Sequence, residues 1–433
     1  VHLQRDPEPA LSGAGRQPRG VGVPGHSRPR VVRFHPSLNP RRGGVVAMIL
    51  ATSAALAGDF DVCVVTEPGG RAELPEEPHV GFRVAECPPP WTRRGWARIR
   101  TWVAGADLVI IEGSWHRWAP AIALLCRRTQ VPYWYAPHGS LSKLVRHRYP
   151  RKHLKKLVWW WLAERRVVAG SYRMWVGSHH ELERARGTFP GMSCEPFVMP
   201  FTCADLGVAE DSPDRDGPHA HTHPGAGTFT LLTLARIDPI KDLPLLLTAC
   251  AAAVREVPGL RLEIAGEGDP HLRARLVAQA NSLGIADRVT WLGFLAGSEK
   301  VAVLHRADAY VCPGPESFGM AVVEALSAGL PVLINDEVGV HAAICPTSAP
   351  PGRAGAASVE NQDDDLAERD RTGWVTAYGD AGQLAEAIVA TASSHERDVG
   401  AARALFEREF SAPAFRRRFL SVWPDPGSKP NPR

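Results

Sequence analysis

The chain has 433 residues, 44% of them hydrophobic, and a formal net charge of +4. That length is enough for two or three domains with buried cores, and the modest charge excludes a strongly acidic or basic protein. The longest apolar run, residues 43–58, is too short and too rich in Ala and Gly to span a bilayer. The eight cysteines form no CxxC pair, so we expect reduced thiols in a cytoplasmic protein without a signal peptide.

Residues 30–206 are predicted to form an N-terminal α/β domain, preceded by a disordered tail at residues 1–29. Short apolar runs that are typical of strands alternate with helical patterns, and this alternation favours a parallel sheet. The strands are expected at residues 30–37, 61–68, 106–113 and 131–139, and the domain is expected to close near residues 174–185 and 196–201.

A second α/β series predicts a C-terminal domain over residues 228–400, joined to the first by a linker at 207–227. Its strands are expected at residues 228–236, 260–268, 289–295, 309–313 and 330–334. Residues 346–371 are expected to be a mobile insertion, and a helix at 401–423 to return to the N-terminal domain before a tail at 424–433. The predicted fold class is therefore α/β, with two doubly wound, Rossmann-like domains facing each other across a cleft.

Two glutamates stand eight positions apart in residues 313–334, PGPESFGMAVVEALSAGLPVLI. Glu316 precedes a predicted helix that begins near Phe318 or Gly319, and Glu324 lies inside that helix. The first backbone N–H groups of a helix have no partners within it and the helix dipole favours an anion there, so this end suits a phosphate. The two carboxylates are then placed to bind two ends of one polyol ligand. The alternative is that Glu316 only caps the helix and Glu324 is a surface residue.

Cations and a histidine follow predicted strands at the same edges of the two sheets. Arg236 comes directly after a strand and Lys241 five residues later, where a bound diphosphate needs cationic partners. His138 ends a strand of the N-terminal domain, and Gly44 belongs to a loop, PRRGGVV, that offers backbone amides to an anion. Taken singly, these residues are equally explained as solvated loop cations, a structural histidine and an ordinary turn.

The order and spacing of several motifs carry more information than any one of them. RIDPIKD, IAGEGD, VTWLGFL, ADAYVCPGPESFGMAVVEALSAGLPVL and TGWVTAYGD follow one another between residues 236 and 380. Together they resemble the retaining, nucleotide-sugar-dependent glycosyltransferases of the GT-B fold, in the branch with the E-x7-E hallmark (glycosyl transferases group 1). The resemblance covers roughly residues 31–420. The N-terminal half, with its PHG-x-L element and a basic helix, is similar to members that build bacterial cell-surface polysaccharides.

The resemblance implies a role for each matching residue. Arg236 and Lys241 would neutralise the donor diphosphate as it leaves, and Glu316 would hold hydroxyls of the donor sugar. His138 would meet that sugar from the other wall of the cleft. The remaining contacts to the donor would come from Glu324, on the ribose, and from backbone amides of Gly44, Phe318, Gly319 and Met320. No metal and no cofactor are expected, because these cations and the helix dipole supply the electrostatic stabilisation.

The implied activity is transfer of a hexose, with retention, from a nucleotide diphosphate to a hydroxyl acceptor such as a lipid-linked glycan. The implied context is cell-surface polysaccharide or glycolipid biosynthesis. A nucleotide-sugar epimerase shares the architecture, but the N-terminal half shows no second carboxylate cluster for its acid–base chemistry. A nucleic-acid-binding protein is disfavoured because no recognisable readout motif accompanies the basic run at 143–166. An inactive scaffold is disfavoured by the intact Arg, Lys and Glu set.

Two metal-like patterns are given little weight. HAHTHP, at residues 219–224, offers three histidines but lies in the predicted linker. QDDDL, at 362–366, is acidic but lies in the predicted insertion and ends no strand. We therefore expect no metal site.

A basic helix predicted at residues 150–166 suggests a membrane contact. Nine Lys or Arg against one acid, Glu164, give residues 143–166 a local charge of +8. At about 100° per residue, one apolar stripe is assigned to the core, and it comprises Leu154, Leu157, Val158, Trp161 and Leu162. Trp159 falls outside that stripe, among Lys152, Lys155, Lys156 and Arg166. The sequence thus predicts peripheral docking on an anionic membrane surface through Trp159 and these cations, unless Trp159 packs on a neighbouring element.

Overall fold

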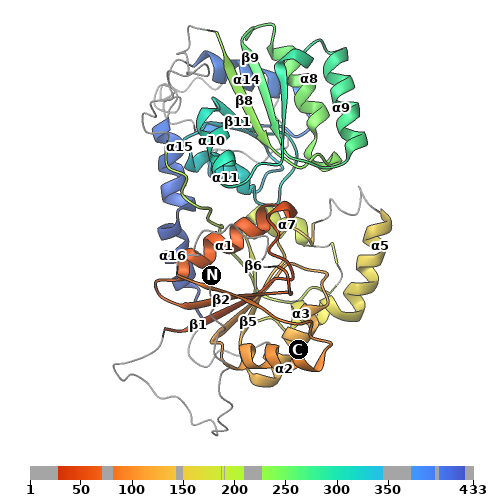
Figure 1. Cartoon of the computed structure of the whole chain (residues 1–433), viewed down its shortest axis with the longest axis vertical. Coiled ribbons are helices and arrows are strands. Elements are labelled where there is room, and N and C mark those ends of the chain that lie inside the picture. The colour runs from red at the N-terminus through yellow and green to blue at the C-terminus, as the bar shows by residue number, and fades with distance from the viewer. Residues whose placement is uncertain are drawn as a thin grey trace, which may run out of the picture.

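The computed structural model of the chain shows two α/β domains, one above the other, with a long C-terminal helical segment running along both (Figure 1). It describes residues 28–70, 81–142, 150–186, 188–189, 191–208, 227–344, 372–394 and 399–424, with only the backbone of residues 42 and 150–152. The predicted insertion at 346–371 lies outside the described residues, as do nearly all of the predicted tails and linker.

The N-terminal domain is built on a seven-stranded parallel sheet with the order β3-β2-β1-β4-β5-β6-β7. Its strands are β1 (Arg30–Phe34), β2 (Asp61–Thr66), β3 (Arg83–Glu86), β4 (Leu108–Glu112), β5 (Tyr133–Ala136), β6 (Arg173–Val176) and β7 (Pro196–Val198). The inner strands are almost wholly buried because helices cover both faces, which is why they are continuous apolar runs.

The helices of this domain connect successive strands. They are the 3₁₀ turn η1 (Pro40–Arg42), α1 (Gly44–Leu56), α2 (Arg93–Ala104), α3 (Trp118–Thr129), α5 (Pro150–Trp159), the π-helical turn η2 (Trp160–Glu164), α6 (Arg165–Ala169) and α7 (His179–Ala185). Helix α5 stands on the outer side of the domain (Figure 1). Ser178 caps helix α7, and its hydroxyl accepts a hydrogen bond from the backbone N–H of Glu181 at 3.0 Å.

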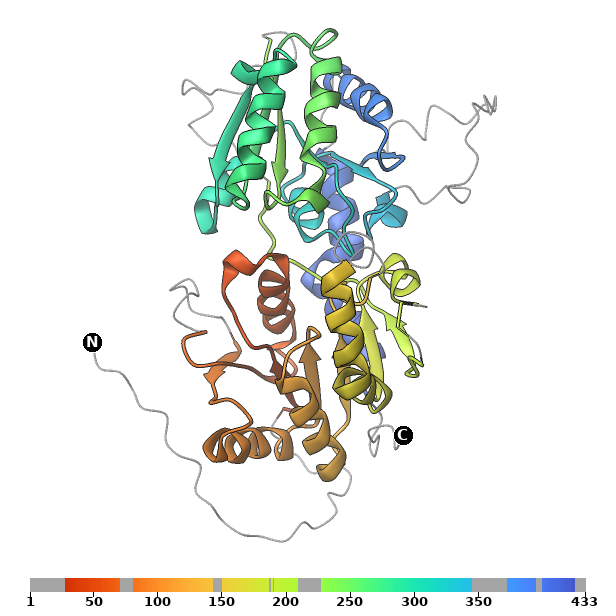
Figure 2. The same ribbon diagram turned by 90° about the vertical axis from the view of Figure 1, so that its right-hand side faces the viewer.

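The C-terminal domain repeats the architecture with a six-stranded parallel sheet in the order β10-β9-β8-β11-β12-β13. Its strands are β8 (Phe229–Leu234), β9 (Leu260–Ala265), β10 (Val289–Gly293), β11 (Ala309–Cys312), β12 (Val332–Asn335) and β13 (Gly373–Thr376). Its helices are η4 (Pro239–Lys241), α8 (Leu243–Ala253), α9 (Pro270–Ser282), η5 (Ala286–Arg288), α10 (Gly297–Arg306), α11 (Met320–Ser327), α12 (His341–Ile344) and α14 (Ala381–Ser393). Figure 2 shows the helices flanking this sheet in the upper domain.

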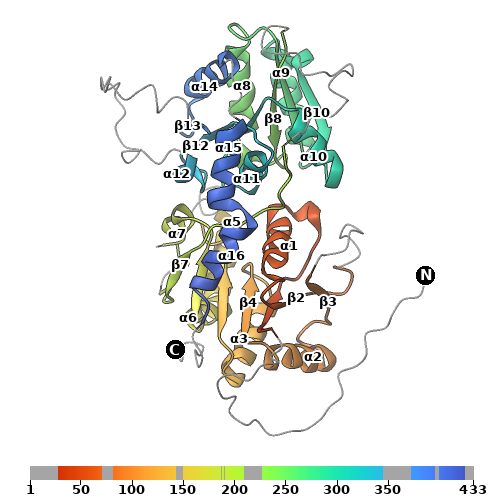
Figure 3. The ribbon, with the colours of Figure 1, turned by 90° about the vertical axis from the view of Figure 1, so that its left-hand side faces the viewer.

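The last helices run from the C-terminal domain down to the N-terminal domain, as Figure 3 shows. They are α15 (Val399–Leu405), the π-helical turn η6 (Phe406–Phe410) and α16 (Ala412–Ser421). Helix α15 packs on α11, whereas α16 packs on α1. Phe419 of α16 also lies 5.4 Å, between ring centroids, from Phe60, which precedes β2. Arg416 also forms an ion pair with Asp59 at the end of α1. This segment holds the two domains together on one side.

The interpretation of helix α5 was wrong about which side chains face the core. Leu154, Val158, Trp161 and Leu162 are 51–66% exposed, so most of the predicted core stripe lies on the surface. Trp160 is fully buried instead and stacks on Phe189. The π-helical turn at 160–164 explains part of the difference, because each extra residue in a turn rotates the following side chains around the helix axis.

Candidate active site

The carboxyl ends of the two parallel sheets face each other, and the loops that follow the strands touch across the domain boundary. Gly139 lies so close to Ser317 that a Cβ on the glycine would stand 1.9 Å from the serine hydroxyl oxygen. The Ser178 hydroxyl donates a hydrogen bond to the backbone carbonyl of Ser317 at 2.9 Å. A Cβ on Gly44 would be 3.0 Å from that of Met320. The residues predicted from both domains therefore meet at one seam.

Lys241 and Glu316, which lie on loops after β8 and β11 of the C-terminal domain, form an ion pair. Lys241 ends the turn η4, which Asp238 caps by accepting a hydrogen bond from the N–H of Ile240 at 3.0 Å. Gly314 brings the Glu316 loop against this turn, since a Cβ there would lie 2.6 Å from the Cα of Lys241. Burial acts to lower the pKa of Lys241, but Glu316 outweighs it and the pKa is raised. The amine is therefore held as a cation.

Glu324 is paired with a second lysine that sequence reasoning missed. The ammonium of Lys300, in the first turns of α10, lies 2.7 Å from Oε1 of Glu324, and both side chains are largely buried. Each carboxylate of the E-x7-E pattern thus has its own lysine. Lys300 follows β10 at the carboxyl edge of the sheet, and that position was the available signal.

The N-terminus of helix α11 lies between these two ion pairs. Gly319 caps the helix with φ of +106°, a left-handed conformation that glycine adopts without strain. Phe318 is buried against Phe201 of the N-terminal domain, with ring centroids 5.0 Å apart. Met320 is the first helical residue, so the backbone amides of residues 318–320 begin the helix beside Gly44.

Arg236 is an exposed residue on the loop after β8, and its charge reaches Lys241, whose pKa it acts to lower. The neighbouring AGEGD turn packs directly on this loop. A Cβ on Gly266 would lie 1.9 Å from the backbone carbonyl oxygen of Ala235, so only glycine allows the approach. The two cations predicted for a diphosphate are thus on one loop of the C-terminal domain.

His138 belongs to the N-terminal domain and precedes Gly139, which touches Ser317 across the domain boundary. His138 follows β5 with φ of +50°, and its side chain is only 5% exposed. Its Nε2 lies 2.6 Å from Oε2 of Glu112, the last residue of β4, and Oε1 of that carboxylate binds the guanidinium of Arg33 in β1. The sequence analysis missed Glu112 and Arg33. A charged residue inside or at the end of a buried strand was the signal that could have found them.

The described residues offer no cluster of three or more His, Cys, Asp or Glu that could hold a metal ion. The patterns at 219–224 and 362–366 lie outside the described residues. Among the described residues, no helix is long and apolar enough to cross a membrane.

Two family models match the chain, one in each domain. Residues 220–372 match the family described as glycosyl transferases group 1, and residues 43–192 match the glycosyl transferase 4-like domain. The C-terminal domain therefore belongs to the glycosyl transferases group 1 family, and the N-terminal domain to the glycosyl transferase 4-like domain. The first match spans Arg236, Lys241, Glu316 and Glu324, and the second spans Gly44, Glu112 and His138.

Curated glycosyltransferases match part of this chain. The D-inositol 3-phosphate glycosyltransferase of Actinosynnema mirum is 30% identical over 198 residues, which are 42% of this chain and 45% of the relative. The phosphatidyl-myo-inositol mannosyltransferase of Mycobacterium leprae is 36% identical over 110 residues, 25% of this chain and 28% of the relative. The chain thus spans less than half the length of these relatives.

The fold is shared along almost the whole chain with a solved structure. The crystal structure of Anabaena HepE in complex with UDP-glucose superposes with a TM-score of 0.66 and 17% identity, covering 91% of this chain and 98% of that one. Together with the two facing parallel sheets, this likeness identifies the architecture as GT-B, as the sequence predicted.

Proposed function

We propose that this protein transfers a sugar from a nucleotide diphosphate to a hydroxyl acceptor, with retention at the anomeric carbon and without a metal ion. The observation that carries the proposal is the Lys241–Glu316 ion pair beside the N-terminus of α11, at the seam of the two domains. Lys241 and the N-terminus of α11 suit a diphosphate, and the Glu316 carboxylate suits a polyol. A nucleotide sugar contains both groups.

The chemistry follows from where negative charge develops. The bond between the anomeric carbon and the diphosphate breaks while the acceptor hydroxyl oxygen bonds to that carbon on the same face, and the departing phosphate takes up the hydroxyl proton. During this step the leaving phosphate gains charge next to Lys241, Arg236 and the first amides of α11. Fixed cations and dipoles stabilise such charge without reorganising, which lowers the barrier. Glu316 is then free to bind sugar hydroxyls once Lys241 turns to the phosphate. Glu324 is in the middle of α11, suitable for the ribose at the other end of the donor.

The names of the relatives favour a glycolipid or polysaccharide context. One relative is named for D-inositol 3-phosphate and another for phosphatidyl-myo-inositol, and HepE was crystallised with UDP-glucose. We propose acceptors of the same chemical kind, which are hydroxylated compounds linked to a phosphate or a lipid. Such acceptors would enter from the N-terminal domain, on the side of His138.

Release of a nucleoside diphosphate tests the proposal. Purified protein is incubated with UDP-glucose or GDP-mannose, each with inositol 3-phosphate, phosphatidylinositol vesicles or no acceptor. We expect release that depends on one acceptor, persists in EDTA and yields a product with the donor's anomeric configuration by NMR. An isomerised nucleotide sugar formed without acceptor would instead show an epimerase. A product of inverted anomeric configuration would overturn the proposed retention, and loss of activity in EDTA would overturn the proposed metal independence.

We further propose that helix α5 docks the enzyme on an anionic membrane surface, with a face different from the one predicted. Leu154, Val158, Trp161 and Leu162 recur at helical spacing and are all more than half exposed. Exposed cations border them, namely Lys155, Arg165 and Arg166. An apolar helical face bordered by cations is suited to the boundary between headgroups and acyl chains, and each cation near the surface contributes about 1 kcal/mol.

Vesicle sedimentation tests this docking. We expect wild-type protein to pellet with phosphatidylglycerol vesicles at low salt, less at high salt, and little with phosphatidylcholine. The double variant Trp161→Ala, Leu162→Ala should lose binding. Trp91→Ala is the matched control, because Trp91 is 60% exposed but lies outside α5. Equal pelleting of the α5 variant and the control would exclude this face.

A further inference from the structure

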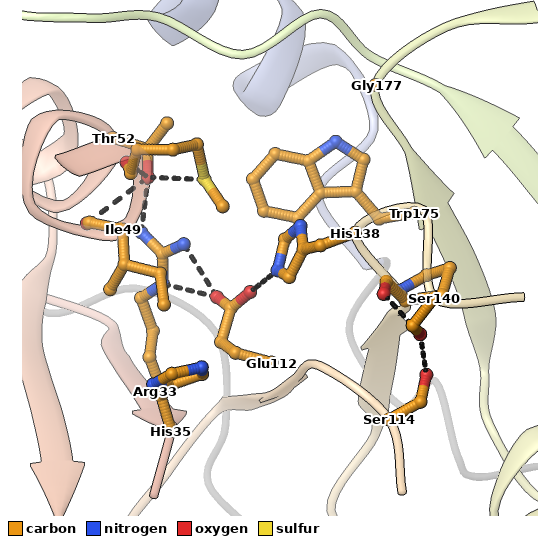
Figure 4. A network of polar contacts seen from close by, with 12 residues as sticks. Arg33, His35, Ile49, Thr52, Glu112, Ser114, His138, Ser140, Trp175 and Gly177 are labelled. Carbon is orange, nitrogen blue, oxygen red and sulfur yellow. Dashed lines mark hydrogen bonds and ion pairs between the residues drawn. The ribbon is translucent and has the colours of Figure 1, made fainter. Parts of the chain in front are cut away.

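A buried polar network lies beneath the seam, in the N-terminal domain (Figure 4). Arg33 and Glu112 have side chains that are 0% exposed, and their ion pair joins the adjacent strands β1 and β4. The guanidinium also donates to α1, at the Thr52 hydroxyl (2.6 Å), the Ser53 hydroxyl (3.0 Å) and the Ile49 carbonyl (3.1 Å). The network therefore connects α1, which begins at Gly44, with the His138 loop.

Each oxygen of the Glu112 carboxylate has a separate partner. Oε1 accepts from Nε of Arg33 at 2.7 Å, and Oε2 lies 2.6 Å from Nε2 of His138. Because an ionised carboxylate only accepts hydrogen bonds, Nε2 of the imidazole carries a proton. Burial acts to raise the pKa of Glu112, but Arg33 and His138 outweigh burial and hold that pKa at about 2. The carboxylate is therefore ionised.

The other ring nitrogen of His138 is left available. Nδ1 is buried and has no hydrogen-bond partner among the residues that the structure describes. The backbone of the same loop is also held, because Glu181 accepts hydrogen bonds from the N–H groups of Gly139 (2.5 Å) and Gly177 (2.8 Å). His138 keeps a left-handed conformation that is rare for a residue with a side chain, and such conformations persist only where the surroundings enforce them.

Packing alone does not account for a buried Arg–Glu pair. Removing two charges from water is costly, and apolar residues of similar volume often stabilise a protein equally well. His138 is the third partner, and apolar residues in place of the pair would offer its ring no hydrogen bond. A hydrogen bond to one nitrogen of an imidazole determines where its proton lies and which way the ring faces.

We propose that Glu112, held by Arg33, is a positioning residue that fixes the His138 ring with Nδ1 available to a hydroxyl group of the substrate. This inference rests on the proposed function, because the hydroxyl belongs to the sugar that the enzyme transfers or extends. Glu112 and Arg33 touch no substrate themselves. They act through His138, and through α1 they keep the Gly44 loop and the His138 loop in one rigid unit.

The test replaces the ion pair by apolar residues of similar size, in the double variant Arg33→Met, Glu112→Leu. We expect it to melt close to the wild-type temperature, since no charge is left unpaired. Its kcat for the best donor and acceptor should nevertheless fall on the order of tenfold to a hundredfold, by analogy with the loss of a partner that orients a metal-bound histidine. Adding His138→Ala to the double variant should cause no further loss. Wild-type kcat in the folded double variant, or a further loss of the same size as His138→Ala alone, would overturn the proposal.

A second measurement does not depend on activity. Two-dimensional ¹H–¹⁵N spectra of ¹⁵N-histidine-labelled protein report which nitrogen carries the proton, and His138→Gln identifies the His138 signals. We expect Nε2 of His138 to be protonated in the wild type and this preference to disappear in Arg33→Met, Glu112→Leu or in Glu112→Gln. A neutral wild-type ring protonated on Nδ1 would refute the positioning role. If no donor and acceptor pair gives turnover, the proposed function fails, and this spectrum still decides the role of Glu112.

Discussion

The indole Nε1 of Trp159 donates a hydrogen bond to Oε2 of Glu164 at 2.8 Å, inside the N-terminal domain. The other oxygen of Glu164 accepts from the Tyr135 hydroxyl at 2.7 Å. Burial raises the pKa of Glu164, and these hydrogen bonds oppose the rise. Trp159 is therefore a partner of a buried carboxyl group and not the membrane anchor that its neighbouring lysines suggested.

Trp159→Phe should destabilise the protein while leaving vesicle binding unchanged. The phenyl ring keeps most of the apolar contact but removes a donor to a buried carboxyl group, which costs about 1–3 kcal/mol. Urea denaturation measures the loss. Trp161→Phe is the control, because Trp161 is 51% exposed and its replacement should change the free energy of unfolding very little. Equal stabilities for the two variants would contradict the assigned contact.

Lys241→Ala should reduce turnover far more than stability. Lys241 lies next to the proposed leaving group, and loss of one such contact costs on the order of 3 kcal/mol, or about a hundredfold in kcat. Arg236→Ala should act in the same direction. Arg100→Ala, which removes an exposed cation from α2, is the control. Near-normal kcat in folded Lys241→Ala would remove this residue from the mechanism.

A nucleotide sugar should stabilise the folded protein, and Glu324 should be needed for the effect. At 100 times its dissociation constant, the donor raises the free energy of unfolding by about 2.7 kcal/mol. A thermal shift screen of nucleotide sugars would identify the donor. Glu324→Ala should diminish the shift at the same concentration, whereas Glu263→Ala, which removes a carboxylate paired with Arg306 away from the α11 site, should retain it. An unchanged shift in Glu324→Ala would place the ribose elsewhere.

Acid should destabilise the protein partly through Glu112. Its pKa is about 2 in the folded protein and about 4.3 in an unfolded chain, so the unfolded state binds the proton first as the pH falls. The stabilisation is complete above about pH 5 and is lost progressively toward pH 2, a change of about 3 kcal/mol. Guanidinium denaturation at pH 6, 4 and 3 measures the slope. The slope should be shallower in Arg33→Met, Glu112→Leu, and an equal slope would assign the acid sensitivity to other groups.

Several features of this protein follow from local sequence alone. Alternating apolar runs and helical patterns are short-range signals, so the two parallel α/β domains were predictable, although the short, partly exposed β3 was not. Glu316 and Glu324 flank a helix start within one short segment, so their spacing was also visible in the sequence. The same holds for Arg236 and Lys241, which follow one strand. Those four residues do lie near the carboxyl edge of one sheet, because parallel strands all end there.

Only the tertiary structure decided how residues far apart in the chain pair with one another. Arg33 and Glu112 are 79 positions apart, and nothing local indicates that one neutralises the other. The burial of side chains on helix α5 was likewise decided only by the tertiary structure. The periodicity of α5 defines an apolar face, but whether that face meets the sheet or the solvent depends on the elements that pack beside the helix, and here Trp160 is the residue they bury. Helical period is a property of the backbone, whereas burial is a property of what the rest of the chain places beside it.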